Sequence, residues 1–175
     1  CVEHKHYSVF ETANITMEVE APRDIARQLL RHRSFTFQEF SQRYAAVTDV
    51  AQLPELRLQD HKNRQNSIEV TDQETMVMIS EFSMRIMDHF IKGKDLYDEM
   101  LEAGIAKECA RKVLPLNTET KLYMTGTVRD WIHYINLRSS NGTQKEHMII
   151  AHEAKQVFTN SLPIVAKALG WDSEE

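Results

Sequence analysis

The 175-residue sequence has little of several residue types, and each shortage excludes a class of protein. Five Gly and four Pro are too few for a collagen-like or low-complexity chain, and the two cysteines, Cys1 and Cys109, cannot form a disulfide framework. No apolar run approaches the roughly 20 residues that a membrane-spanning helix needs, and no signal peptide is visible. We therefore expect no membrane partner and a reducing compartment, either the cytoplasm or a host cytoplasm if the source is a virus.

The composition describes an ordinary folded chain. Hydrophobic residues make up 42% of the sequence and charged residues 27%, which is enough apolar material for a buried core. The first residue is Cys1 rather than Met. We expect a single domain over residues 1–175 that lacks its natural N-terminal segment.

The charge balance is acidic overall but locally basic. A net charge of −5 argues against a protein that grips a nucleic-acid backbone over a wide surface, so no nucleic-acid partner is expected. One short stretch nevertheless concentrates positive charge in Arg23, Arg27, Arg31, Arg33 and Arg43. Such a cluster in an acidic protein indicates a compact anionic ligand such as a nucleotide phosphate.

The hydrophobic pattern predicts a few strands followed by mostly helices, which is typical of an α+β fold. Strands are expected over residues 14–20, where polar and apolar residues alternate, and over residues 120–127. Helices are expected over residues 22–32, 71–104, 105–114, 128–137, 143–158 and 163–170.

Local signals define some ends and connections of these elements. Capping boxes at Thr71 with Glu74 and at Thr143 with Glu146 would open two of the helices. The methionines follow the helical apolar pattern and are expected in the core. Residues 34–44 have no helical period and are expected to form an extended loop whose Phe residues act as anchors. Residues 45–68 are polar and irregular, and their length is more typical of a functional loop than of a plain connector.

The most informative string joins the end of the first predicted helix to the loop that follows. Arg31 and Arg33 flank His32, and side chains that diverge at a helix end can reach different ligands. Farther along, Ser41 and Arg43 offer a hydroxyl and a guanidinium suited to phosphate oxygens, and Glu39 can accept a hydrogen bond from a ligand N–H. A solvated arginine face with surface salt bridges is the alternative interpretation, and it is the better one for any single arginine taken alone.

This string resembles the signature of flavin-dependent thymidylate synthases, which is Arg-His-Arg, seven residues and then Ser. Gln28 stands three residues before Arg31, as it does in that family, and Ser41-Gln42-Arg43-Tyr44 resembles the family's Ser-x-Arg-Tyr. The segment His6-Tyr7-Ser8-Val9-Phe10-Glu11 is similar to its His-x-Ser/Thr-x-x-Glu. The histidine that often follows that glutamate is Thr12 here.

The C-terminal half carries the rest of the resemblance. Glu108 to Pro115 resembles the family's Glu-x-Ala-Arg-x-x-Leu-Pro block. Arg129, His133 and Arg138 fall where the family has a second flavin patch and an arginine that contacts the pyrimidine. Thr127 replaces an Asn that is common in the family. Matches in the same order span nearly the whole chain.

The resemblance implies an α+β fold with an antiparallel sheet, and an enzyme that converts dUMP to dTMP. It implies FAD as the cofactor, NADPH and methylene-tetrahydrofolate as co-substrates, and a homotetramer with sites at subunit interfaces. The residues implied for dUMP are Gln28, Arg31, Glu39, Ser41, Gln42, Arg43, Arg111 and Arg138. Those implied for FAD are Ser8, Arg31, His32, Arg33, Arg129 and His133, with His6 and Tyr44 on the folate and nicotinamide side.

The implied chemistry needs no protein nucleophile, and Arg138 would be the catalytic residue. Its cation would stabilise negative charge that develops on the uracil. The flavin would perform the redox chemistry while the protein supplies position and charge. Cys109 invites comparison with thymidylate synthases that attack through a thiolate, but its helical context predicts a small buried residue.

Two other functions remain open from the residues alone. A metal-dependent nucleotide hydrolase would also place Arg and His around a phosphate, but it should show clustered metal ligands. The pairs His4 with His6 and His147 with His152 lack zincin spacing and a third ligand, so we predict no metal site there. A nucleic-acid-binding module would use the same Arg and aromatic residues, but it should show strongly salt-dependent affinity for oligonucleotides.

Overall fold

The computed structural model describes residues 1–140 and 142–171 of the chain. Its internal contacts divide the chain into two compact units. Unit 1 comprises Cys1–Val19, Gln28–Gln38 and Leu122–Glu175, and unit 2 comprises Glu20–Arg27 and Glu39–Lys121. The structure is a small antiparallel sheet accompanied by helices, which confirms the predicted α+β class.

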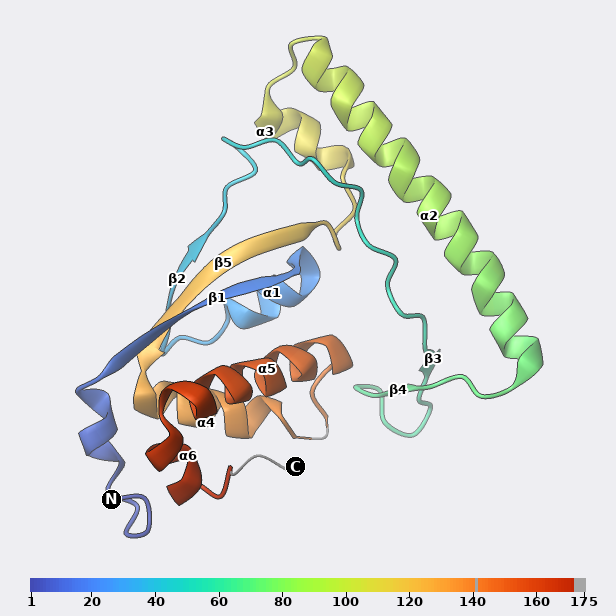
Figure 1. Ribbon diagram of the computed structural model, residues 1–175. Coiled ribbons are helices and arrows are strands. Elements are labelled where there is room, and N and C mark those ends of the chain that lie inside the picture. The colour runs from blue at the N-terminus through green and yellow to red at the C-terminus, as the bar shows by residue number, and fades with distance from the viewer. Residues whose placement is uncertain (141, 172–175) are drawn as a thin grey trace. The chain divides into compact units, whose positions relative to one another are not determined.

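Three strands form the main sheet in the order β1, β5, β2 (Figure 1). They are β1 (Asn14–Pro22), β5 (Glu119–Thr127) and β2 (Thr36–Glu39). Side chains alternate between buried and accessible along β5, as the period of a strand requires, and the two predicted strands are confirmed.

The predicted loop over residues 34–44 is partly wrong, because it contains β2. Accessibility alternates along this short strand in the same two-residue period. Of the three aromatic anchors, Phe35 is buried, but Phe40 remains 56% exposed. Gly126 makes room for Phe35, since a Cβ at that glycine would lie 2.6 Å from the phenyl ring.

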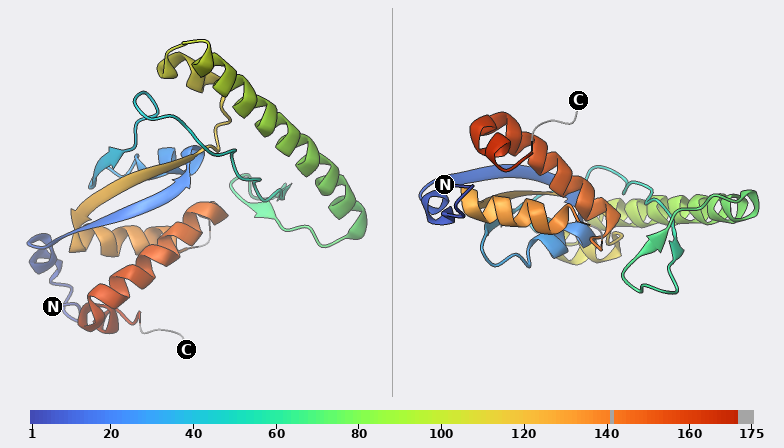
Figure 2. Two further views of the ribbon diagram at one scale, coloured as in Figure 1. Left: turned by 45° about the horizontal axis from the view of Figure 1, so that its top comes forward. Right: turned by 90° about the horizontal axis from the view of Figure 1, so that it is seen from below.

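Unit 1 packs its helices around aromatic side chains. Helices α4 (Val128–Arg138) and α5 (Lys145–Ser161) lie side by side, and α6 (Pro163–Ala168) continues from α5 (Figure 2). The rings of Trp131 and Phe35 meet edge to face with centroids 4.9 Å apart. The indole N–H of Trp131 donates to the Ile15 carbonyl oxygen at 3.1 Å, which ties α4 to β1.

Neither of the two predicted capping boxes forms at the start of its helix. The N-cap of α2 (Gln73–Glu102) is Asp72 rather than Thr71, and its carboxylate accepts from the Thr75 N–H at 2.8 Å. The N-cap of α5 is Gln144, which makes no side-chain capping bond, so the box at Thr143 is also wrong. Thr127 caps α4 instead, in a reciprocal capping box with Asp130.

The first helix is shorter than predicted. Helix α1 (Arg23–Leu29) begins after Pro22, which still belongs to β1, and ends before the Arg-His-Arg string. Ile25 and Leu29 are buried as expected, whereas Leu30 is exposed. The turn after α1 therefore carries the Arg-His-Arg string, Arg31 to Arg33, which is not part of a helix.

Unit 2 contains the long helix α2, the short helix α3 (Lys107–Ala110), the 3-10 turn η2 (Arg111–Val113) and the hairpin of β3 (Leu58–Gln59) with β4 (Ser67–Ile68). Helix α2 buries Phe90, Lys94 and Tyr97 in its C-terminal half. Farther toward its N-terminus Met76, Phe82 and Met84 are exposed, Met84 to 65%. The prediction that the methionines are core residues is therefore wrong for this part of α2.

The predicted burial of Cys109 is also wrong. Cys109 is exposed on α3, and the neighbouring Ala110 is the buried residue. Both cysteines are free thiols. Within residues 1–140 and 142–171, no helix is long and apolar enough to cross a membrane.

Candidate active site

The residues predicted to bind ligands divide into two groups, one in each unit. Unit 1 holds His6, Ser8, Gln28, Arg31, His32, Arg33, Arg129, His133 and Arg138, and unit 2 holds Glu39, Ser41, Gln42, Arg43, Tyr44 and Arg111.

Two members of the unit 2 group, Gln42 and Arg111, line a cationic hollow of about 240 Å³. Arg23, Arg27, Arg111 and Lys112 line it together with Gln42. Arg23 is partly neutralised by Glu39, 3.3 Å away. The other three cations make no ion pair within the described part of the chain. The hollow therefore has an unbalanced positive charge of the kind that a phosphate group neutralises.

Sequence reasoning found only part of this hollow. Gln42 and Arg111 were predicted ligand residues, and Arg23 and Arg27 were noted only as members of a basic cluster. Their spacing of four residues places both arginines on one face of α1, so helical periodicity could have identified them together. Lys112 was missed, and it had no signal beyond its position next to Arg111.

A turn at Ser41 and the helix α3 hold the other predicted phosphate ligands. The hydroxyl oxygen of Ser41 accepts from the backbone N–H of Arg43 at 3.3 Å. The Arg43 side chain forms an ion pair with Glu108 at 3.3 Å, although both groups are about half exposed and the pair is weak. Lys107 donates to the Tyr44 carbonyl oxygen at 3.1 Å. These contacts join the Ser41 turn to the segment that leads into Arg111.

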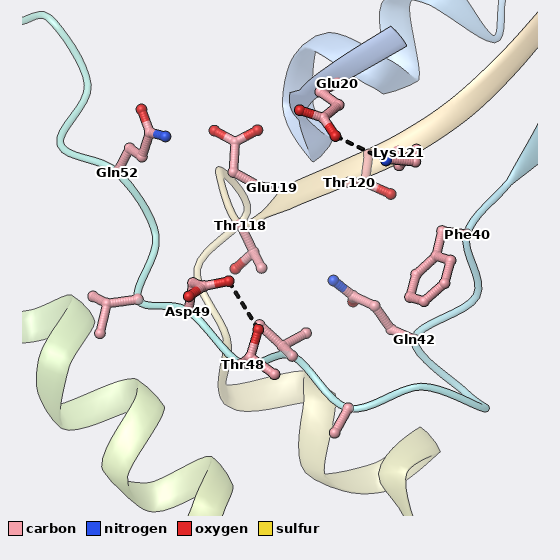
Figure 3. Close-up of a pocket in the computed structure, with 13 residues that line it drawn as sticks. Glu20, Phe40, Gln42, Thr48, Asp49, Gln52, Thr118, Glu119, Thr120 and Lys121 are labelled. Carbon is pink, nitrogen blue, oxygen red and sulfur yellow. Dashed lines mark hydrogen bonds and ion pairs between the residues drawn. The ribbon is translucent and has the colours of Figure 1, made fainter. Parts of the chain in front are cut away.

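A second hollow of about 370 Å³ also has Gln42 in its lining (Figure 3). Its lining includes the carboxylates of Glu20, Asp49 and Glu119. Burial and then the negative charges of Glu20 and Asp24 raise the pKa of Glu119. This environment disfavours a further anion. Lys121 also lines the larger hollow and neutralises Glu20 at 2.9 Å, but the remaining carboxylates make this hollow less suited to a phosphate than the cationic hollow.

Gln42 lines both hollows. Its side chain is only 6% exposed, and its amide nitrogen points into the acidic hollow without a partner among the described residues (Figure 3). In the cationic hollow Gln42 contributes to the wall.

The group in unit 1 is organised around two imidazoles. The Nε–H of Arg138 donates to Nε2 of His32 at 3.0 Å. The amide nitrogen of Gln28 donates to Oε1 of Gln144 at 2.7 Å, and its Oε1 lies 3.4 Å from Nδ1 of His147. The structure thus brings Gln28, His32 and Arg138 into one cluster, although they are far apart in the sequence.

The histidines of this cluster are neutral at pH 7. Burial, with smaller contributions from Arg138 and His133, lowers the pKa of His32 to about 4. Burial, Arg138 and His32 lower the pKa of His147 to about 4 as well. A neutral His32 can accept at Nε2, which is what the Arg138 contact requires.

His147 and Gln144 are members of the cluster that sequence reasoning missed. His147 was considered only as a metal ligand or as a solvated or core histidine, and Gln144 was not singled out. No group of three or more metal-ligating side chains occurs in the described residues. The link is tertiary, because Gln28 lies 116 positions before Gln144.

The residues that the resemblance implies for FAD fit an anionic cofactor in charge and exposure. Arg31 and Arg33 are exposed, and neither guanidinium has an ion pair within the described residues. Ser8 and His133 are also exposed, whereas Arg129 forms an ion pair with Glu11. Unpaired guanidinium groups on a surface suit the diphosphate of FAD. His32 retains only Nδ1 for a ligand, because Nε2 holds Arg138.

Three other predicted positions have defined surroundings. His6 precedes the 3-10 helix η1 (Tyr7–Glu11), and its side chain is exposed. Tyr44 belongs to unit 2 and is 76% exposed. Thr127 has its hydroxyl bonded to Asp130, so the residue that replaces the common Asn has a structural role as an N-cap.

Known proteins share this sequence over most of its length. Residues 1–164 match the family described as "Thymidylate synthase complementing protein". A probable flavin-dependent thymidylate synthase of Paramecium bursaria Chlorella virus 1 is 51% identical over 98% of this chain and 78% of the relative. The flavin-dependent thymidylate synthase of Synechocystis sp. is 48% identical over the same shares of the two chains.

Solved structures show the same fold. The crystal structure of the UMP/dUMP methylase PolB from Streptomyces cacaoi bound with 5-Br UMP matches with a TM-score of 0.82 and 26% identity. That match covers 96% of this chain and 77% of the methylase. The same methylase bound with 5-Br dUMP matches with a TM-score of 0.78 and 28% identity, over 97% and 75% of the two chains. This chain therefore belongs to the flavin-dependent thymidylate synthase family.

Proposed function

We propose that this chain converts dUMP to dTMP, with methylene-tetrahydrofolate as the carbon donor, NADPH as the reductant and FAD as the cofactor. The observation that carries the proposal is that two groups of side chains differ in their chemistry, and each suits a different part of a nucleotide. Unit 2 offers a cationic hollow with unbalanced charge, and unit 1 offers an arginine and an amide held by neutral imidazoles. A nucleotide has a phosphate and a base that need these two kinds of group.

The phosphate end of dUMP is assigned to unit 2. Arg111, Arg27 and Lys112 would neutralise the phosphate, while the Ser41 turn supplies the hydroxyl and Arg43. Glu39 is engaged by Arg23 and by the Thr120 hydroxyl at 3.1 Å, so it would position these groups as well as accept from a ligand. Charge-assisted bonds of this kind are about twice as strong as neutral ones.

The pyrimidine end is assigned to unit 1. Arg138 would place its guanidinium beside the uracil and stabilise the negative charge that develops on the ring. His32 accepts from Nε of Arg138, so the terminal nitrogens of the guanidinium remain available to the substrate. Gln28 would contact the same ring.

Arg31 and Arg33 would hold the diphosphate of FAD, together with His32, Ser8, Arg129 and His133. When bound, FAD would supply the redox chemistry of the reaction. His6 and Tyr44 would contact the folate and nicotinamide side.

The reaction is proposed to proceed without a protein nucleophile. The Ser41 hydroxyl oxygen accepts from the backbone N–H of Arg43, and among the described residues no histidine hydrogen-bonds to it. A serine needs an adjacent base to attack. Cys109 is exposed on α3 and is given no catalytic role.

We further propose a homotetramer whose sites form between subunits, with the whole chain acting as one functional domain in the cytoplasm. The exposed apolar side chains of α2, including Met76, Phe82 and Met84, support a subunit interface on this helix. A second copy of the chain would cover them.

An anaerobic assay tests the function directly. Purified protein is mixed with dUMP, methylene-tetrahydrofolate, NADPH and FAD, and the nucleotide product is separated by chromatography. We expect dTMP only when all four are present and a flavin spectrum in the protein. A parallel reaction with UMP measures preference for the deoxyribose. Failure of flavin-loaded protein to make dTMP would contradict the proposal.

A further inference from the structure

His147 is a buried polar residue that contacts Gln28, a residue proposed to bind the pyrimidine of dUMP. It lies in the first turn of α5, and its side chain is 0% exposed. Its Nδ1 is 3.4 Å from Oε1 of Gln28, a long hydrogen bond. Its ring also lies near those of His32 and Tyr134, with centroids 6.0 and 5.8 Å away.

The Gln28 amide is held at both ends. Its nitrogen donates to Gln144 at 2.7 Å, so its oxygen is the end that faces His147. A carbonyl oxygen only accepts, and Nδ1 of His147 must therefore carry the proton. If the Gln28 amide turned over, its N–H would face the protonated Nδ1 of His147 and that contact would be lost.

The burial of His147 fixes this tautomer. Its Nε2 has no hydrogen-bond partner among the described residues. With the proton on Nδ1, Nε2 carries only a lone pair. The other tautomer would bury an N–H without an acceptor, and orphaned N–H groups are rarer in proteins than acceptors that lack a donor.

The groups that face His147 also favour its neutral form. They are Gln28 and His32 from the segment around the Arg-His-Arg string, and Tyr134 and Arg138 from α4. Burial and the positive charge of Arg138 lower the pKa of His147 to about 4. The direction of the Gln28 amide therefore remains constant over the working pH range of an enzyme.

We propose that His147 is a positioning residue that turns the amide nitrogen of Gln28 toward the pyrimidine and thereby selects uracil over cytosine. The proposal rests on the proposed function, in which Gln28 contacts dUMP. One N–H of the Gln28 nitrogen is used by Gln144 and the second is free to donate. Uracil has a carbonyl oxygen at C4, whereas cytosine has an amino group there, so cytosine would oppose a donor to a donor. A Gln28 amide free to turn over would accept either base.

The test compares dUMP and dCMP binding to the flavin-loaded protein. His147→Leu removes the Nδ1 donor and keeps an apolar side chain in the buried site. In this variant the ratio of the dCMP dissociation constant to the dUMP dissociation constant should fall about tenfold, which is the effect of one oriented hydrogen bond. His147→Asn retains an N–H near the Nδ1 position and should restore most of the ratio. His152→Leu, an exposed histidine on the same helix, is the matched control and should change nothing.

A double-mutant cycle separates this role from general loss of structure. In a Gln28→Ala background, His147→Leu should have no further effect on the ratio, because the amide that it orients is gone. An unchanged ratio in His147→Leu, or an equal further loss in the Gln28→Ala background, would overturn the proposal. If the wild-type protein makes dTMP but His147→Leu leaves the ratio of dissociation constants unchanged, only this inference fails. If the wild-type protein does not bind dUMP, the proposed function fails.

The tautomer can be measured without any substitution. Nitrogen-15 chemical shifts of His147 in the flavin-loaded wild-type protein at pH 7 should show a protonated Nδ1 and an unprotonated Nε2. A protonated Nε2 would overturn the proposal, even if His147→Leu fails to fold.

Discussion

Acid should destabilise the fold through the buried imidazole of His147. The ring is fully buried, and burial, Arg138 and His32 lower its pKa from the ordinary 6.5 to about 4. In the unfolded chain the same histidine should titrate near its ordinary value. The unfolded state therefore binds more protons between these two pH values, and the folded state loses stability as the pH falls through this range.

The magnitude follows from the two pKa values. Between pH 7.5 and pH 5, a histidine whose pKa changes from 6.5 to about 4 on folding costs about 2 kcal/mol of unfolding free energy. The full difference between the two pKa values corresponds to about 3 kcal/mol, which is reached only below about pH 3. His32 contributes in the same direction, but its ring is only half-buried and its share is smaller.

Urea unfolding at both pH values measures the effect, with FAD at one saturating concentration throughout. His147→Leu removes the titrating group, so this variant should lose about 2 kcal/mol less than wild type between pH 7.5 and pH 5. His152→Leu removes an exposed histidine and should lose as much as wild type. If His147→Leu and wild type lose the same stability, His147 is not a buried neutral group and the reasoning is refuted.

The remaining predictions concern the substrate groups and the assembly. Arg138→Lys should retain FAD but lose most dTMP formation, because an ammonium cannot both bond to His32 and present a planar pair of donors; near-normal turnover would remove Arg138 from the site. Ser41→Ala should need roughly 10- to 150-fold more dUMP yet still turn over at saturation, as measured by steady-state kinetics. If Ser41→Ala instead lost all turnover while it bound dUMP normally, the Ser41 hydroxyl would take part in the chemical step. Met84→Asp should weaken the oligomer in light scattering, whereas Met84→Leu, which keeps an apolar side chain of similar size, should not; an unchanged tetramer in Met84→Asp would place the interface elsewhere.

The elements that sequence reasoning found are those whose pattern is repeated over several turns or pleats. Strand β5 alternates over nine residues and α4 follows helical spacing, so both were predicted within a residue of their ends. Strand β2 has only four residues, and it exists because β5 pairs with it. A pattern that short carries little information before its partner is known.

Other differences arise from choices that depend on the surroundings. Thr71 and Asp72 are both good N-caps, and the sequence does not decide between neighbours. The apolar face of α2 was read correctly as helical, but periodicity does not reveal whether the chain itself or another molecule covers Met84.

The candidate site likewise combines residues that a local sequence pattern reveals with residues that only the fold brings together. Ser41, Gln42 and Arg43 form a local turn, so the string that contains them identified them directly. The contacts of Gln28 with Gln144 and His147 join positions more than a hundred residues apart. No local pattern can reveal such a network, although an unexplained polar residue in a helical apolar face is a reason to look for one.

The most direct test of the central claim mixes two inactive variants. Arg138→Lys alters the residues proposed to bind the pyrimidine, and Arg111→Ala alters those proposed to bind the phosphate. Each variant alone should make little dTMP. In an equal mixture, co-refolded with FAD, a site built from two subunits has about a one-in-four chance of receiving both intact groups. We predict that the mixture forms dTMP at about a quarter of the wild-type rate per site. A mixture no more active than either variant, beside an active wild type, would contradict the claim that the sites form between subunits, and an inactive flavin-loaded wild type would contradict the function itself.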